Sequence, residues 1–392
     1  MESLINEDFL LGNGYARELY HESAEKQPII DYHCHLVPQQ VAENHRFADI
    51  TEVWLGGDHY KWRALRGNGV GEDFITGNRS SWEKFEKWAE TVPYTMRNPL
   101  YHWTHLELAR VFGIYDILKP ETARSIYDRC NEMLGTEEFR AQALMRKFNV
   151  ETVCTTDDPT DSLEWHKQIA EHPFGVQVLP TWRPDKVMGV DAPESFATYI
   201  GKLSEVSGVG ITGYQDLLDA LRKRHEFFAR MGCRLSDHGL DTFYSDDCPR
   251  EEADRIFRKV LGGQVPDAAE VSKFKSAVLF DLAAMDCESG WTQQFHVVLT
   301  ETTTAGCSRN SARTRVSTPL TTNRLRLPVT DSSAISPTKI NSERPYSTTS
   351  TRRIRRSLRL WHIPSMTEAC LGRCSMAQPG GFSIRRTVCA SR

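Results

Sequence analysis

The stretch that decides the fold is Pro28-Ile29-Ile30-Asp31-Tyr32-His33-Cys34-His35. Its apolar first half predicts a short buried strand that ends in two histidines. Because alternate residues of a strand point to the same side, both imidazoles would project toward one point at the C-terminal end of the strand. That arrangement suits a metal ion or a polarised substrate oxygen. The alternative is two polar residues in a turn.

Charge is divided unevenly along the chain of 392 residues. Hydrophobic residues make up 40% and charged residues 26%, which allows one large α/β domain or two ordinary ones. Residues 297–392 hold 16 Lys and Arg, 15 of them Arg, against 4 acidic residues, a net charge of +12. Residues 1–296 hold 32 basic and 48 acidic residues, a net charge of −16. Two different kinds of chain are therefore joined near residue 297.

The sequence predicts neither export nor insertion into a membrane. Its first residues are acidic, and no basic segment followed by an apolar run stands there, so we expect no secretory signal. No apolar stretch reaches the length of a membrane span. The sequence therefore predicts a cytoplasmic protein that has no membrane partner.

Helices alternate with strands along most of the chain, whereas residues 82–135, rich in Trp, Tyr and Leu, predict a helical insertion. The alternation predicts a parallel sheet, and polar residues at several strand ends favour a (β/α)8 TIM-type barrel over a doubly wound sheet. No glycine-rich phosphate loop follows a strand, so no nucleotide cofactor is expected. The expected strands cover residues 28–35, 150–156, 176–182, 233–239 and 291–296. The expected helices cover residues 7–26, 137–147, 161–171, 193–206, 213–231, 250–262 and 267–288.

Five separated motifs together resemble uronate isomerase (glucuronate isomerase), a branch of the amidohydrolase superfamily. They are Asp31–Pro38, Gly57–Arg63, Thr181–Lys186, Ser236–Gly239 and Gln294–His296. The resemblance covers about residues 5–296 and implies a metal-dependent-hydrolase-like barrel domain over 1–296. It also implies a small-molecule substrate: D-glucuronate is interconverted with D-fructuronate, and D-galacturonate with D-tagaturonate, in hexuronate catabolism. A homo-oligomer is left open.

The chemistry of this isomerisation suggests catalytic and metal-binding roles for several residues of the motifs. A proton leaves C2 and another is delivered to C1, while negative charge on two oxygens is stabilised. A divalent metal held by His33 and His35 would polarise those oxygens, with zinc as the first candidate. Tyr60, His296 or Asp237 would move the protons. Whether the metal is required is left open.

Three further residues are candidates for binding the substrate. Arg183 suits the carboxylate of a uronate because its guanidinium offers forked donors; the alternative is that it only pairs with Asp185. His59 would contact the substrate, although a solvated helix start is the simpler account of the Gly57–Arg63 run. His238 would contact sugar hydroxyls, and both it and Asp237 have a structural role as the alternative.

The resemblance ends after His296, where the chain becomes rich in Ser, Thr and Arg. Re-reading the codons one frame over turns four tail segments into strings compatible with uronate isomerase, in family order. We therefore expect a frameshift and an aberrant, disordered tail over 297–392, with the C-terminal barrel strands missing or garbled. Unpaired strand edges would then make the product prone to aggregation and poorly active.

Two other functions compete with the isomerase. A metal-dependent hydrolase is one, because the first-strand His-x-His is shared by the whole superfamily. A non-catalytic protein whose basic tail binds nucleic acid is the other, with Arg352-Arg353-Ile354-Arg355-Arg356 as the densest cluster. The leading interpretation is the isomerase, with no nucleic-acid partner.

Overall fold

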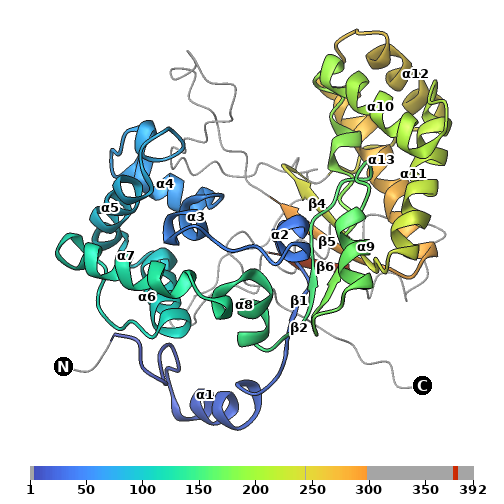
Figure 1. Cartoon of the computed structure of the whole chain (residues 1–392). Coiled ribbons are helices and arrows are strands. Elements are labelled where there is room, and N and C mark those ends of the chain that lie inside the picture. Colours follow the sequence, from blue (N-terminus) through green and yellow to red (C-terminus); the bar gives the residue numbers. More distant parts are fainter. Residues whose placement is uncertain (1–3, 243, 298–373, 378–392) are drawn as a thin grey trace, which may run out of the picture. The chain divides into compact units, whose positions relative to one another are not determined.

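The computed structural model describes residues 4–242, 244–297 and 374–377 (Figure 1). They fall into two compact units. The first holds the chain up to Asp185 together with residues 201–210 and 219–237, and the second holds residues 186–200, 211–218 and those from 238 onward. The predicted tail lies outside the described residues, apart from Val297 and residues 374–377.

The N-terminal helix is shorter than predicted. Instead of one helix over 7–26, α1 spans Gly14–Leu19 and continues as a π-helical turn over Tyr20–Ala24. The side chain of Asn13 accepts a hydrogen bond from the Ala16 amide at 2.9 Å and so caps α1. No residue of α1 is buried, and the Tyr15 side chain is 80% exposed.

Three parallel strands form the sheet of the first unit: β1 (Ile29–Asp31), β2 (Val150–Cys154) and β3 (Gln177–Leu179), in that order. The prediction that β1 is buried was wrong, since Ile29 is 45% and Ile30 47% exposed. The reason is that β1 lies at the edge of this sheet and pairs with β2 alone among the described strands.

Short helices cover the sheet of the first unit. They are α2 (Pro38–Ala42), α8 (Ala141–Lys147) and α9 (Glu164–Glu171). Their buried side chains Val41, Met145 and Ile169 pack in one cluster with Val153 and Val178 of the strands. This layer of helices on parallel strands confirms the predicted α/β class.

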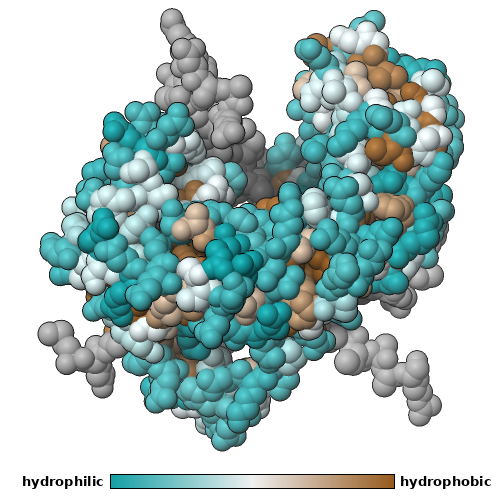
Figure 2. All heavy atoms as spheres, viewed as in Figure 1, coloured by the Kyte–Doolittle hydropathy of each residue, from teal (hydrophilic) through white to brown (hydrophobic). Residues whose placement is uncertain are grey.

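The region from Ile50 to Leu134 is helical, as predicted for its larger part. It contains α3 (Ile50–Leu55), α4 (His59–Gly67), α5 (Ser81–Thr91), α6 (Pro99–Phe112) and α7 (Pro120–Leu134), with 3-10 turns at Glu72–Phe74, Val92–Thr95 and, just beyond, Glu137–Phe139. Its core is apolar and largely aromatic, with Trp54, Phe85 and Trp88 almost completely buried. The side chains left on the surface of this region in view are mostly hydrophilic (Figure 2).

The C-terminal half continues the alternation of helices and strands. It comprises a 3-10 turn (Asp185–Met188), α10 (Pro193–Ser207), α11 (Tyr214–Arg230), β4 (Leu235–Leu240), α12 (Arg250–Leu261), α13 (Ala268–Glu288), β5 (Thr292–Val297) and β6 (Cys374–Ala377). The core of the second unit includes Phe196, Phe257 and Phe274, whose rings contact one another.

A second sheet has the order β4-β5-β6, and β5 and β6 run parallel. Strand β6 was not predicted. The described strands form two three-stranded sheets, so the eight-stranded barrel stays a prediction. Among the described helices, not one combines the length and the apolar character that crossing a membrane requires.

Candidate functional site

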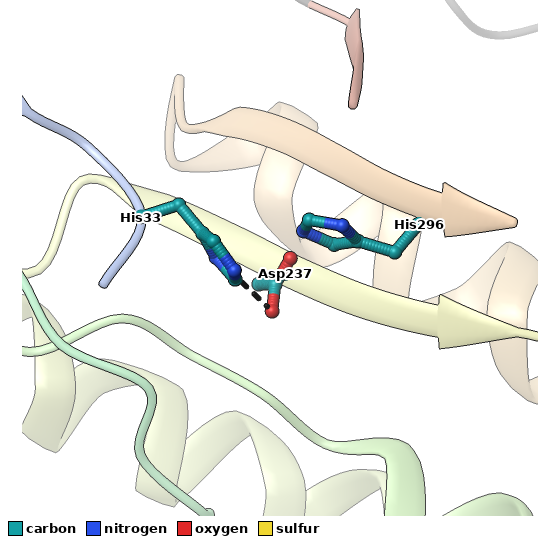
Figure 3. Close-up of side chains that lie close together, drawn as sticks. All are labelled: His33, Asp237 and His296. Carbon is teal, nitrogen blue, oxygen red and sulfur yellow. Dashed lines mark ion pairs between the residues drawn. The ribbon is translucent and has the colours of Figure 1, made fainter. Parts of the chain in front are cut away.

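The centre of the candidate site is the pair His33 and Asp237. His33 lies two residues beyond the end of β1, and Asp237 is the third residue of β4. The Nδ1 atom of His33 is 3.7 Å from Oδ2 of Asp237 (Figure 3). The Asp237 side chain is completely buried. Because a buried carboxylate is costly without partners, its contacts with cationic or metal-binding groups determine whether this position is tolerated.

His296 completes a group of three ligand-type side chains. The ligand atoms of His33, Asp237 and His296 all lie within 4.8 Å of one another (Figure 3). Two imidazole nitrogens and one carboxylate oxygen are a donor set that zinc and related divalent metals accept. The sequence assigned His296 and Asp237 to proton transfer, whereas the structure brings them together with His33 as candidate ligands.

Arg183 lies beside the same carboxylate. Its Nε is 3.4 Å from Asp237 Oδ2 and 3.2 Å from Asp185 Oδ2, so the expected alternative of pairing with Asp185 is present, and binding of a substrate carboxylate stays a prediction. The Arg183 side chain is 30% exposed. A forked pair of donors next to a candidate metal group can bind a carboxylate in bidentate fashion.

His35 lies near His33 but makes a different contact. The two rings meet edge to face with their centroids 5.0 Å apart. His35 is exposed, and its Nδ1 is 3.3 Å from the hydroxyl of Thr156 at the end of β2. The structure therefore groups His33, and not its predicted partner His35, with Asp237 and His296.

His59 and Tyr60 begin α4, where the helix start is built around Asp58. The Asp58 carboxylate accepts the amide hydrogens of Tyr60 at 2.9 Å and Lys61 at 3.0 Å, which is an ordinary N-cap. Tyr60 is 51% exposed, and the Arg63 guanidinium lies over its ring. His59 packs edge to face on Trp62. The simpler account of this run as a helix start thus describes its local structure.

His238 is buried in a setting that is largely structural. Its side chain is 1% exposed, its ring stacks on that of Phe295, and its Nε2 is 3.9 Å from Asp286 Oδ2. Asp286 in turn accepts a hydrogen bond from Gln293 Nε2 at 3.1 Å. These contacts join β4, α13 and β5, and they favour the structural alternative that the sequence left open for His238.

A buried polar group at the end of β2 was missed as a candidate. Thr155 Oγ1 lies 2.7 Å from Asp157 Oδ2 and 2.8 Å from His166 Nε2, and all three side chains are buried. Burial raises the pKa of Asp157 to about 6 and lowers the pKa of His166 to about 4. The available signal was that Asp157 follows directly after a predicted strand.

Comparison with known proteins identifies the family. A family model described as glucuronate isomerase matches residues 1–308. The uronate isomerase of Bacteroides fragilis is 60% identical over 297 residues, which is 76% of this chain and 64% of that protein. The uronate isomerase of Bacteroides thetaiotaomicron is 59% identical over the same coverage. The chain thus spans 64% of the length of these relatives.

Solved structures agree with this assignment. The uronate isomerase of Thermotoga maritima has a TM-score of 0.72 at 37% identity, covering 75% of this chain and 64% of that one. The glucuronate isomerase of Caulobacter crescentus has a TM-score of 0.70 at 29% identity, covering 74% and 63%. The chain therefore belongs to the glucuronate isomerase family, as its five sequence motifs predicted.

Proposed function

We propose that this chain carries the site of a uronate isomerase, which interconverts D-glucuronate with D-fructuronate and D-galacturonate with D-tagaturonate. The observation that carries the proposal is the group of His33, Asp237 and His296 with the Arg183 guanidinium against the same carboxylate. An aldose–ketose isomerase for a sugar acid needs both a group that polarises oxygens and a cation for the acid.

The three ligand-type residues fit a divalent metal, and we propose zinc. Two ligand atoms that share one zinc ion are each about 2.0–2.2 Å from it, so they can be no more than about 4.4 Å apart. The separation of His33 Nδ1 and Asp237 Oδ2 is 3.7 Å, within that limit, and all three ligand atoms lie within 4.8 Å of one another, so binding would draw the group slightly closer. A bound metal would supply Lewis-acid polarisation of the carbonyl and hydroxyl oxygens at C1 and C2. His35, which the sequence predicts as a metal ligand together with His33, lies beside His33 and stays a candidate ligand.

The remaining residues bind the substrate and move its protons. The terminal nitrogens of Arg183 would hold the C6 carboxylate, which orients the other end of the open-chain sugar. Asp237 Oδ2 contacts both His33 and Arg183 and so fixes the positions of these two side chains relative to each other. With Asp237 and His296 engaged as ligands, the Tyr60 phenol is the proton carrier and His59 contacts the substrate, whereas His238 keeps the structural role that its contacts favour.

The proposal includes the finer features that the sequence suggested. Residues 1–296 would form most of a (β/α)8 barrel, with residues 82–135 as its helical insertion, and the protein would act in the cytoplasm on a small hexuronate. Isolated parallel pairings of Asp157 with Trp182 and of Trp182 with Ser236 support the barrel, because they continue β2, β3 and β4 in chain order.

We propose further that residues 297–392 are translated from a shifted frame. In support, the similarity to the Bacteroides relatives extends over 297 residues. The tail also lacks the Thr-Asp-Ser-Arg pattern that the family resemblance leads one to expect at the last strand. Without that strand the site would lack the aspartate and arginine of this pattern, so we expect little isomerase activity from the 392-residue chain.

One experiment tests function and frame together. D-glucuronate isomerisation is measured for the 392-residue chain and for a version whose frame is restored after the His296 codon, each with added zinc. We expect turnover from the restored version only, and loss of that turnover on Arg183→Met. Failure of both versions would contradict the isomerase, whereas turnover by the 392-residue chain comparable to an intact relative would contradict the frameshift argument.

A further inference from the structure

The pairing of β2 with β3 is interrupted close to the candidate site. Regular pairing runs up to Cys154 and Leu179, and the Thr155 amide still donates to the Leu179 carbonyl at 3.0 Å. The next residue on the β3 side is Pro180, which has no amide hydrogen and cannot donate to a neighbouring strand. The next amide that can donate toward β2 is that of Thr181, and this amide needs an acceptor.

The carboxylate of Asp157 supplies this acceptor. Its Oδ2 accepts the amide hydrogen of Thr181 at 3.1 Å, in place of a carbonyl of the strand. Backbone pairing then resumes, because the Asp157 amide donates to the Thr181 carbonyl at 3.1 Å and the Arg183 amide donates to the Asp157 carbonyl at 2.9 Å. Asp157 thus contacts the segment on both sides of Trp182.

The same segment continues to Asp237. The Trp182 amide donates to the Leu235 carbonyl at 3.2 Å, and the Asp237 amide donates to the Trp182 carbonyl at 2.9 Å. Trp182 is completely buried, with its ring edge to face against Phe228. A chain of hydrogen bonds therefore runs from the Asp157 side chain to the backbone of both Arg183 and Asp237.

Asp157 is itself held by two buried groups. The Thr155 hydroxyl has a single hydrogen to donate. Its oxygen, Oγ1, lies 2.7 Å from Asp157 Oδ2. If Thr155 donates that hydrogen to the carboxylate, then Nε2 of His166, 2.8 Å from the same hydroxyl, must be the donor in the second contact. His166 and Asp157 are 3% and 5% exposed, so water does not substitute readily for either contact.

We propose that Asp157 is a positioning residue: its carboxylate spans the break at Pro180 and sets the backbone from which Arg183 and Asp237 extend. A purely structural carboxylate would stabilise the chain as a whole. A positioning carboxylate holds the Thr181 amide and, through the adjoining backbone pairing, affects the Arg183 and Asp237 amides and the uronate site. The effect on the uronate site rests on the proposed function, whereas the effect on the backbone amides does not.

The test is hydrogen exchange of the Arg183 and Asp237 amides in the full chain, with Asp161→Asn in the same loop as the matched control. In Asp157→Ala we expect exchange at these two amides to rise about tenfold, since the Thr181 amide between the two strands loses its buried acceptor and the adjoining backbone pairing loosens. Asp157→Asn keeps an acceptor oxygen and should restore exchange to within about twofold of the parent chain. Unchanged exchange in Asp157→Ala, or a rise spread evenly over the first unit, would overturn the proposal.

A second variant keeps the test decisive if Asp157→Ala does not fold. Thr155→Val removes the hydroxyl with little change in volume, and we expect a smaller rise at the same two amides; no change there would again contradict the proposal. The dissociation constant for D-glucuronate, measured by calorimetry, should rise about tenfold in Asp157→Ala and recover in Asp157→Asn. If the parent chain with its frame restored binds no D-glucuronate, the proposed function fails, and the exchange data alone decide the role of Asp157.

Discussion

The helical region of residues 50–134 and the strand-end region around Asp157, Arg183 and Asp237 differ in the side chains that they bury. In the helical region the buried residues are mainly aromatic and aliphatic, with fewer buried polar residues such as Lys61 and His105. In the strand-end region, Asp157, His166 and Asp237 are all less than 6% exposed. Apolar burial needs only a close fit, whereas each buried polar group needs a particular partner. The stability of the helical region should therefore fall gradually with the apolar area that a substitution removes. The strand-end region should be sensitive to the loss of a single hydrogen-bonding atom.

The largest effect on stability is expected from Phe85 in the helical core. Its ring is completely buried between those of Trp54 and Tyr127. Phe85→Ala removes most of this contact area and leaves a cavity, so the free energy of unfolding should fall by about 3–5 kcal/mol. Urea denaturation of the full chain, followed by Trp fluorescence, measures the loss.

The matched control for Phe85 is an exposed aromatic residue of the same region. Tyr94 is 78% exposed, and Tyr94→Ala should change the free energy of unfolding by less than about 0.5 kcal/mol. Equal losses for the two variants would show that burial is not what stabilises this region. In addition, exchange at the Arg183 and Asp237 amides should be the same in Tyr94→Ala as in the parent chain.

The two regions were predictable from the sequence to different degrees. Helical periodicity and aromatic content were enough to predict the helical region, because burial of an apolar face leaves a local pattern. The polar residues His33, Arg183, Asp237 and His296 were found because each follows or ends a strand. The grouping of Asp237 with His33 was not predictable, because contacts between residues about 200 positions apart depend on how the strands are arranged.

The pH dependence of stability separates the two buried titrating groups. The raised pKa of Asp157, about 6 against an ordinary 3.8, gives stability that is present below pH 3.8 and lost as the pH rises to 6. The lowered pKa of His166, about 4 against 6.5, gives stability that is present above pH 6.5 and lost as the pH falls to 4. Each displacement is worth about 3 kcal/mol, and the signs oppose, so the two contributions nearly cancel between pH 4 and 6.5.

Removing one partner should expose the contribution of the other. Relative to the parent chain, His166→Phe should lose about 3 kcal/mol of stability as the pH rises from 4 to 6.5, and Asp157→Asn should gain about 3 kcal/mol over the same range. Denaturant titrations at four pH values measure both slopes. Parallel pH profiles for the two variants would contradict the assigned burial of this pair.

Metal binding should stabilise the chain through Asp237. A ligand that binds only the folded state at a hundred times its dissociation constant adds about 2.7 kcal/mol. We expect zinc to raise the unfolding midpoint of the parent chain but not that of Asp237→Asn. His35→Gln is the matched control, because His35 is outside the group of three ligands. Loss of the zinc effect in His35→Gln would restore the originally predicted His33 and His35 pair.

The Asp157 group could not be identified beforehand, for a reason that the Pro180 break makes clear. A strand followed by Thr155-Thr156-Asp157 is consistent with a turn, a cap or a site, and the sequence alone does not distinguish among them. The need for an acceptor arises only when the Thr181 amide of a different strand lies alongside. Local patterns therefore predict which residues are polar and near a strand end, while the strand partner determines what each one does.

The smallest effect is expected at a polar contact of the helical region. Ser80 caps α5: its hydroxyl accepts the Glu83 amide hydrogen, and the Glu83 carboxylate accepts the Ser80 amide hydrogen in return. Ser80→Ala should cost about 1 kcal/mol of unfolding free energy, and Ser80→Asp, which keeps an acceptor, should cost little. Denaturant titration measures both. Because this cap is exposed, water replaces part of what the alanine variant loses; a cost as large as that of Phe85→Ala would mean that the helical region also depends on single polar atoms.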